Sequence, residues 1–243
     1  MKPRFIAGPP GTGKTHDFIL GLYKKLLKED YPPEKIVILS HTNVAANQIK
    51  EAVLKLPEMQ GRGFTLKSMK KTISTIHSYC KGRLLPKEKF DLDDHKNLII
   101  QEKYFKLDPQ TDIERKHKFY RYISDARGHG KTLEEYWKIC NKDIDALVID
   151  ECQDSNVPQT LAIEKMAKNV KEGHYYLVGD ADQTLFEYSG SDADKYHKLA
   201  ANPYDELKEG KRCSEAINKH CRKAIEPIWD HYGSHRVWTP AKF

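Results

Sequence analysis

The sequence GPPGTGKT, from Gly8 to Thr15, has residue types and a spacing that can hold a nucleotide phosphate. It fits the pattern G-x-x-x-x-G-K-[ST] in full. The glycines let the backbone curl so that its N–H groups point at phosphate oxygens, and the N-terminus of the following helix adds its positive end. In this pattern Lys14 reaches the β and γ phosphates, and the Thr15 hydroxyl is a ligand of Mg²⁺. We expect these residues to bind the nucleotide: Gly8, Pro9, Pro10, Gly11, Thr12, Gly13, Lys14 and Thr15.

A second polar cluster ends the apolar run in ALVIDECQD, which contains Asp150 and Glu151. In an open parallel sheet, ligands gather at the carboxyl ends of the strands, so this cluster and the phosphate loop can face the same phosphate. Asp150 is then placed to hold Mg²⁺, directly or through water. Glu151 is placed to accept a proton from the attacking water.

A third cluster lies in VGDADQTLFEYSG, from Val178 to Gly190, where an apolar strand passes into acids, an amide and aromatic residues. Gln183 lies just past the expected strand, so its side-chain amide can hydrogen-bond the γ-phosphate or the attacking water. We therefore count Gln183 with Lys14 and Glu151 as a candidate catalytic residue.

The elements that must position these clusters alternate between strands and helices. Short apolar runs predict strands at 4–7, 35–40, 72–77, 145–151 and 174–180. Helical spacing of apolar residues follows three of them, for example Phe18, Leu22 and Leu26 after the first. This alternation predicts an α/β domain with a central parallel sheet that is covered on both faces.

The alternation breaks between residues 84 and 143, where the sequence is highly charged and three helices are expected. We interpret this segment as a small all-helical subdomain inserted into the α/β domain. Its basic and aromatic run at 114–122 could line a channel for a nucleic-acid strand, but a helix with its aromatic residues inward and its charges solvated is the favoured interpretation.

Composition limits the class of protein. The 243 residues carry a formal net charge of +6, a mild basic bias that is compatible with a polyanionic partner. No apolar run approaches the ~20 residues that a membrane span needs, and the N-terminus does not read as a signal peptide. The five cysteines include no CxxC pair, which indicates reduced thiols and a cytoplasmic location.

The order of the motifs resembles the UvrD/Rep-like branch of superfamily 1 helicases. The phosphate loop, SHTNVAANQ, STIHSYC, DECQD, GDADQTLFEYSG and LKEGKR follow one another from residue 5 to about 217. The resemblance implies a RecA-like P-loop NTPase domain at 1–83 and 144–204, with ATP and Mg²⁺ as cofactors. It also implies single-stranded DNA as partner, 3′-to-5′ travel and a bacterial or phage-type context.

The resemblance also assigns further residues. It implies that Gln183 couples the γ-phosphate to strand binding and that Arg212 reaches the γ-phosphate. An aromatic platform at Tyr188 would stack on a base, which is worth about 1–3 kcal/mol per base. Each assignment has a plainer alternative: Arg212 as a solvated helix-start arginine and Tyr188 as a core aromatic. The remaining strand contacts that the resemblance implies are His41, Thr42, Asn43, Thr75 and His77.

Two of these strand contacts also have plainer alternatives. His41 stands where the family often has phenylalanine, so a stacking role is weakened there, and a histidine at a strand end is often a satisfied surface residue. Thr75 could simply cap the helix that follows its strand.

The sequence departs from the family pattern in three ways. The glutamine that reads adenine upstream of the loop is missing, and Lys211 replaces a tyrosine that stacks on adenine. The chain stops at Phe243, so we expect a truncated protein in which 205–243 is the helical start of a second RecA-like half. Alone, we expect a poorly active monomer, because an arginine finger from that half can be worth ~10³–10⁵ in rate.

These observations predict the N-terminal motor domain of an ATP-dependent DNA helicase or translocase. The alternative is a nucleotide-gated module that binds single-stranded nucleic acid without unwinding it. A P-loop kinase of small molecules would explain the phosphate loop but not DECQD or Gln183. RNA is also possible as the strand, since stacking platforms accept both nucleic acids.

Overall fold

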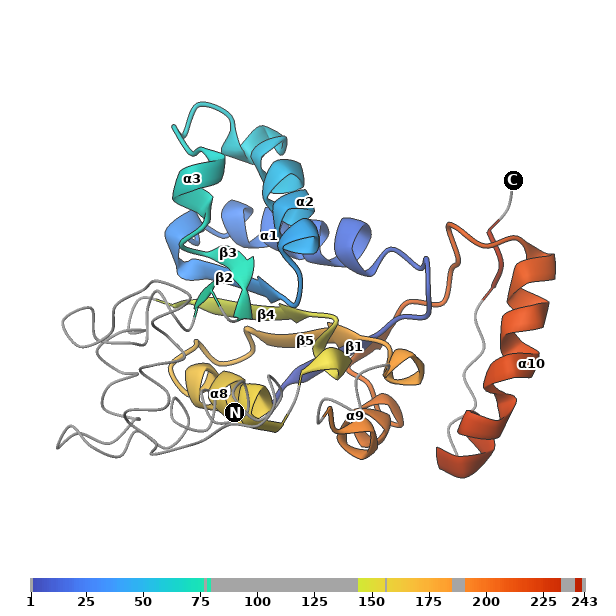
Figure 1. Ribbon diagram of the computed structural model, residues 1–243. Helices are drawn as coiled ribbons and strands as arrows, with labels where there is room; N and C mark the ends of the chain where they lie inside the picture. Colours follow the sequence, from blue (N-terminus) through green and yellow to red (C-terminus); the bar gives the residue numbers. More distant parts are fainter. Residues whose placement is uncertain are drawn as a thin grey trace, which may run out of the picture.

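The centre of the protein is a six-stranded parallel sheet with the strand order β3-β2-β4-β5-β1-β6 (Figure 1). The computed structural model describes residues 2–76, 78–79, 144–155, 157–184, 191–232 and 239–241. The strands are β1 (Arg4–Ala7), β2 (Ile36–Ser40), β3 (Ile73–Thr75), β4 (Ala146–Asp150), β5 (Tyr175–Gly179) and β6 (Asp205–Glu206).

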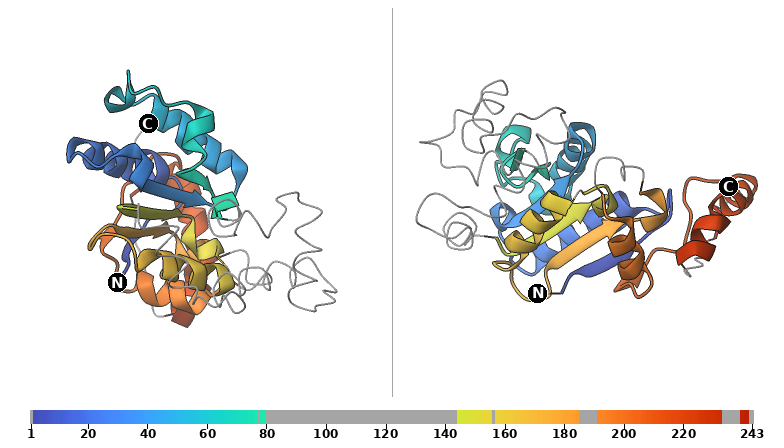
Figure 2. Two further views of the ribbon diagram at one scale, coloured as in Figure 1. Left: turned by 90° about the vertical axis from the view of Figure 1, so that its left-hand side faces the viewer. Right: turned by 60° about the horizontal axis from the view of Figure 1, so that its bottom comes forward.

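Helices cover both faces of this sheet, as the views in Figures 1 and 2 show. One face carries the helical turn η1 (Lys14–Ile19), α1 (Leu20–Lys28), α2 (Asn43–Leu54) and α3 (Leu66–Met69). The other face carries α8 (Val157–Ala167) and α9 (Ala193–Ala200). Short 3₁₀ turns are η2 (Pro33–Lys35), η3 (Pro57–Met59), η4 (Cys152–Asp154) and η5 (Ala181–Gln183).

Every residue of β2, β4 and β5 is buried, because side chains on both faces of the sheet meet a helix layer. Successive residues enter opposite cores: Val148 packs with the α1 and α2 layer, and Ile149 packs with the α8 and α9 layer. This two-sided burial explains why the strands read as continuous apolar runs. The predicted α/β fold with a parallel sheet is confirmed.

Strand β6 was not predicted from the sequence. Asp205 and Glu206 pair in parallel with the edge of β1, and Leu207 N–H donates to the Ala7 carbonyl at 2.8 Å. The strand begins at the residue where the sequence analysis placed the start of a second domain. The first residues of that segment therefore belong to the sheet of the first domain.

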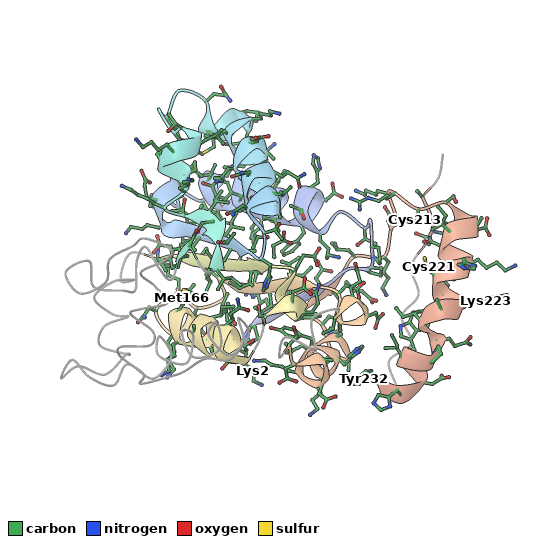
Figure 3. The ribbon with its side chains drawn as sticks, in the orientation of Figure 1. Lys2, Met166, Cys213, Cys221, Lys223 and Tyr232 are labelled. Atoms are coloured by element: carbon green, nitrogen blue, oxygen red, sulfur yellow. The ribbon has the colours of Figure 1, made fainter. Side chains whose placement is uncertain are left out.

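The segment after β6 leads into α10 (Glu215–Tyr232), which is mostly exposed (Figure 1). Figure 3 shows Cys213 before this helix, and Cys221, Lys223 and Tyr232 along it. The predicted helical insertion at 84–143 lies outside the described residues. Within the described part of the chain, no helix is long and apolar enough to cross a membrane.

Candidate nucleotide-binding site

The phosphate loop joins the end of β1 to the start of η1 and is held close to β5. Gly8 N–H donates to the Gly179 carbonyl at 3.1 Å. A Cβ on Gly8 would lie 2.8 Å from the Lys14 side chain, and Gly13 has a φ of +88°, which favours glycine. The two glycines thus allow the tight curl that the motif predicts.

Lys14 connects this loop to the tip of β4. Its side chain is buried, and its Nζ donates to the Gly8 carbonyl at 2.9 Å. The same Nζ lies 3.8 Å from Oε1 of Glu151. The predicted phosphate-binding lysine and the predicted general base therefore share one site at the carboxyl ends of the strands.

Asp150 is the last residue of β4 and is 2% exposed. Its pKa is raised to about 7, mainly by burial and also by the neighbouring Glu151 charge, although Lys14, a backbone hydrogen bond from Glu151 and a hydrogen bond from the Thr15 side chain act in the opposite direction. Its Oδ1 is buried without a hydrogen-bond partner in the described chain. A buried carboxylate oxygen beside a threonine hydroxyl is a donor set that fits Mg²⁺, which takes few protein ligands when phosphates supply others.

Glu151 follows in the left-handed region, with φ 49° and ψ 47°. A non-glycine residue in this region costs on the order of 1–3 kcal/mol, so the surrounding structure must hold the turn. The Gln153 amide holds the Glu151 side chain, because its Nε2 donates to Glu151 Oε2 at 3.0 Å. Glu151 is partly exposed, so a water molecule can reach its carboxylate.

Gln183 lies in η5, the turn directly after β5. Its Nε2 donates to Oδ2 of the buried Asp180 at 2.6 Å. The Asp180 N–H in turn donates to Oε1 of Gln153 at 3.2 Å. Glu151 and Gln183 are therefore joined through Gln153 and Asp180, two residues to which the sequence analysis assigned no role.

A family model described as an AAA domain matches residues 1–189 of the 243-residue chain. The match includes the phosphate loop, Asp150, Glu151 and Gln183. The chain belongs to the AAA domain family. Its described core is that of a P-loop NTPase, and the parallel sheet is consistent with a RecA-like fold. A comparison with curated proteins gave no significant match.

Arg212 lies beyond the matched AAA domain, in a segment that runs along the phosphate loop. Lys211 N–H donates to the Gly11 carbonyl at 2.7 Å, and the Arg212 Cβ lies 2.6 Å from where a Cβ on Gly11 would be. The Lys211 Nζ donates to the Asp17 carboxylate, and this hydrogen bond lowers the pKa of Asp17. The backbone of Arg212 is thus beside the loop, while its side chain is exposed.

Four of the residues predicted to bind a nucleic-acid strand lie at the same edge of the AAA domain, at the ends of β2 and β3: His41, Thr42, Asn43 and Thr75. His41 Nε2 is 3.1 Å from Oγ of the buried Ser155, and burial lowers the pKa of His41 to about 4. Thr42 and Asn43 are exposed, and the Thr42 hydroxyl caps α2 by accepting Ala45 N–H at 3.1 Å.

Thr75 is buried, and its hydroxyl accepts Ser78 N–H at 3.1 Å. It therefore makes the capping contact that was the plainer of its two interpretations. His77 and Tyr188 lie outside the described residues, so their predicted contacts stay predictions.

Proposed function

We propose that this chain is the front motor half of an ATP-dependent translocase or helicase that moves on single-stranded DNA. The membership in the AAA domain family supports the ATP site. The motor assignment rests on one observation above all: hydrogen bonds join the Glu151 turn to the Gln183 turn. A motor needs such a connection, because the state of the nucleotide must change the grip on the strand.

Each residue at the carboxyl ends of the β-strands has a separate role in hydrolysis. The loop N–H groups and Lys14 hold the phosphates, and Thr15 with Asp150 would hold Mg²⁺. When bound, Mg²⁺ neutralises charge that develops on the phosphate oxygens. Glu151 accepts a proton from the water whose oxygen attacks the γ-phosphorus, and the bond to the β–γ bridging oxygen breaks to give ADP and inorganic phosphate.

Gln183 hydrogen-bonds the γ-phosphate or the water, and Arg212 stabilises charge that spreads over the transferred phosphoryl group. The Arg212 backbone lies beside Gly11, so the exposed Arg212 side chain is close enough to reach the phosphate loop. Hydrolysis at full rate requires a second RecA-like half in cis, which supplies further arginines across the cleft.

In this proposal the single-stranded nucleic acid lies over the carboxyl edge of the sheet. The exposed Thr42 and Asn43 contact its backbone, and Tyr188 stacks on a base. Such contacts are largely blind to sequence. Single-stranded DNA is the proposed partner, and RNA is the alternative strand.

The test is the ATP hydrolysis rate of the purified chain, measured with oligo-dT, with oligo-rU and without nucleic acid. We expect oligo-dT to raise the turnover number, and Glu151→Gln to abolish that increase. Turnover that no nucleic acid changes would overturn the motor assignment. If the affinity for single-stranded nucleic acid depends on ATP but no ATP is hydrolysed, the nucleotide-gated binding module is favoured instead.

A further inference from the structure

Gln153 is a buried amide that contacts two loops of the site at once. It is 2% exposed and lies in η4, between the catalytic turn and α8. Its Nε2 donates to Glu151 Oε2 at 3.0 Å, and its Oε1 accepts Asp180 N–H at 3.2 Å. A carboxylate can only accept and a backbone N–H can only donate, so these partners fix which end of the amide is which.

We propose that Gln153 is a positioning residue that aims the Glu151 carboxylate and joins it to the turn that carries Gln183. This inference rests on the proposed function, because it assigns Gln153 to the hydrolysis at that site. Only an amide of this length fits both partners. A glutamate would lack the donor and would repel Glu151, and an apolar side chain would lose both hydrogen bonds.

The end of strand β5 leaves room for the Gln153 amide. Gly179 ends β5, and a Cβ on it would lie 2.4 Å from Gln153 Oε1 and 2.9 Å from Cys152 Sγ. A glycine is therefore required there for Gln153 to reach the Asp180 N–H. This close approach gives a second way to displace the amide, by a substitution in β5 instead of one in η4.

Glu151 needs such a contact. Its backbone is held in the left-handed region and its side chain is partly exposed, so several rotamers are open to it. The Gln153 hydrogen bond selects the rotamer that places the carboxylate beside Lys14. A base must stay within hydrogen-bond reach of the proton that it takes, so a loose carboxylate slows the chemical step more than binding.

The connection continues beyond Asp180. Its carboxylate accepts from the Gln183 side chain at 2.6 Å and from Asp182 N–H at 3.2 Å. A shift of Gln183 on a change of the bound phosphate thus reaches Glu151 through Asp180, which contacts Gln183 with its carboxylate and Gln153 with its backbone N–H, and then through the Gln153 side chain. The same route in reverse would let a bound strand improve the alignment of the base.

The experiment compares Gln153→Met and Gly179→Ala with the wild-type chain. Gln153→Met is similar in volume but makes neither hydrogen bond, and Gln48→Met on the exposed side of α2 is the matched control. We expect Gln153→Met to lower kcat by about 10²-fold. The affinity for ATP should change by less than about threefold, and the stimulation by oligo-dT should disappear. Gly179→Ala should act in the same direction.

A double-mutant comparison separates positioning from a merely structural role. In the Glu151→Gln background the positioned carboxylate is already gone, so adding Gln153→Met should lower the single-turnover rate by less than about twofold. Thermal unfolding checks that each variant is folded, and Gly179→Ala carries the test if Gln153→Met does not fold.

The outcomes distinguish this inference from the proposed function. A wild-type chain that turns over no ATP overturns both. Wild-type turnover with an unchanged kcat in both variants overturns the role of Gln153 alone. An equal loss from Gln153→Met with and without Glu151 also overturns it, because the effect would then not pass through that carboxylate.

Discussion

Trp229 donates its indole N–H to the Asp182 carboxylate at 2.9 Å. Asp182 directly precedes Gln183, and Trp229 is buried although most of α10 is exposed. Three residues further on, Tyr232 stacks on His197 of α9 with a centroid distance of 3.7 Å; Figure 3 shows Tyr232 at the end of its helix. The C-terminal helix is thereby anchored on the turn that holds the candidate γ-phosphate sensor.

Trp229→Phe should destabilise the protein. The substitution keeps an aromatic ring but removes the hydrogen bond to a carboxylate that is itself buried, a loss of roughly 1–3 kcal/mol in the free energy of unfolding. Urea unfolding measures this change. Ile228→Val, at the exposed neighbouring position, is the control and should leave the value close to that of the wild type. Equal stability of both variants would show that the contact does not anchor the helix.

Lys211→Met should raise the pKa of Asp17 toward its ordinary value. The hydrogen bond from Lys211 is the main cause of the lowered pKa of Asp17, with smaller contributions from its charge and from His16, and burial opposes them. A carboxyl-detected NMR titration measures the pKa. Lys208→Met removes a different ion pair, the one with Glu206, and should leave Asp17 unchanged. An unchanged pKa of Asp17 in Lys211→Met would exclude the hydrogen bond between Lys211 and Asp17.

The sign of the stability effect follows from the direction of that shift. Because the folded pKa is lowered, the pair stabilises the protein above the pKa of an unfolded aspartate, and this contribution disappears as the pH falls through the folded value. Both side chains are more than a third exposed, so the contribution is small.

His41 should make the protein less stable as the pH falls from about 6.5 to about 4. Burial lowers the pKa of folded His41 to about 4, whereas an unfolded histidine titrates near 6.5. The unfolded chain therefore binds more protons in this window, and stability decreases with falling pH. The pKa of Asp150 and that of Asp154 are each raised to about 7, so these carboxyls act in the opposite direction over the same window.

The difference between wild type and His41→Asn isolates the histidine. The free energy of unfolding of wild type should fall more steeply than that of His41→Asn between pH 6.5 and 4. His16→Asn removes an exposed histidine and should follow the wild-type slope. Parallel curves for wild type and His41→Asn would mean that His41 titrates normally.

The sheet could be predicted from the sequence for a simple reason. Strands β2, β4 and β5 are buried on both faces, so each is a continuous apolar run. Strand β6 has no such signal: Asp205 and Glu206 are polar and not buried, and they form a strand only because the edge of β1 offers backbone partners.

The convergence of Lys14, Asp150 and Glu151 could be predicted because parallel strands bring their carboxyl ends to one edge. The contacts of Gln153 with Asp180 and of His41 with Ser155 could not. Each joins two different strand ends, and side-chain partners across strands depend on the strand order, which the motifs do not encode.

Paired measurements of ATP binding and hydrolysis on wild type, Lys14→Ala and Glu151→Gln test the central claim most directly. If the cluster at the strand tips is a hydrolysis site with Glu151 as its base, Glu151→Gln should bind ATP within about threefold of wild type and lose turnover by about 10²- to 10⁴-fold. Lys14→Ala should lose binding. Wild-type turnover by Glu151→Gln would contradict the account.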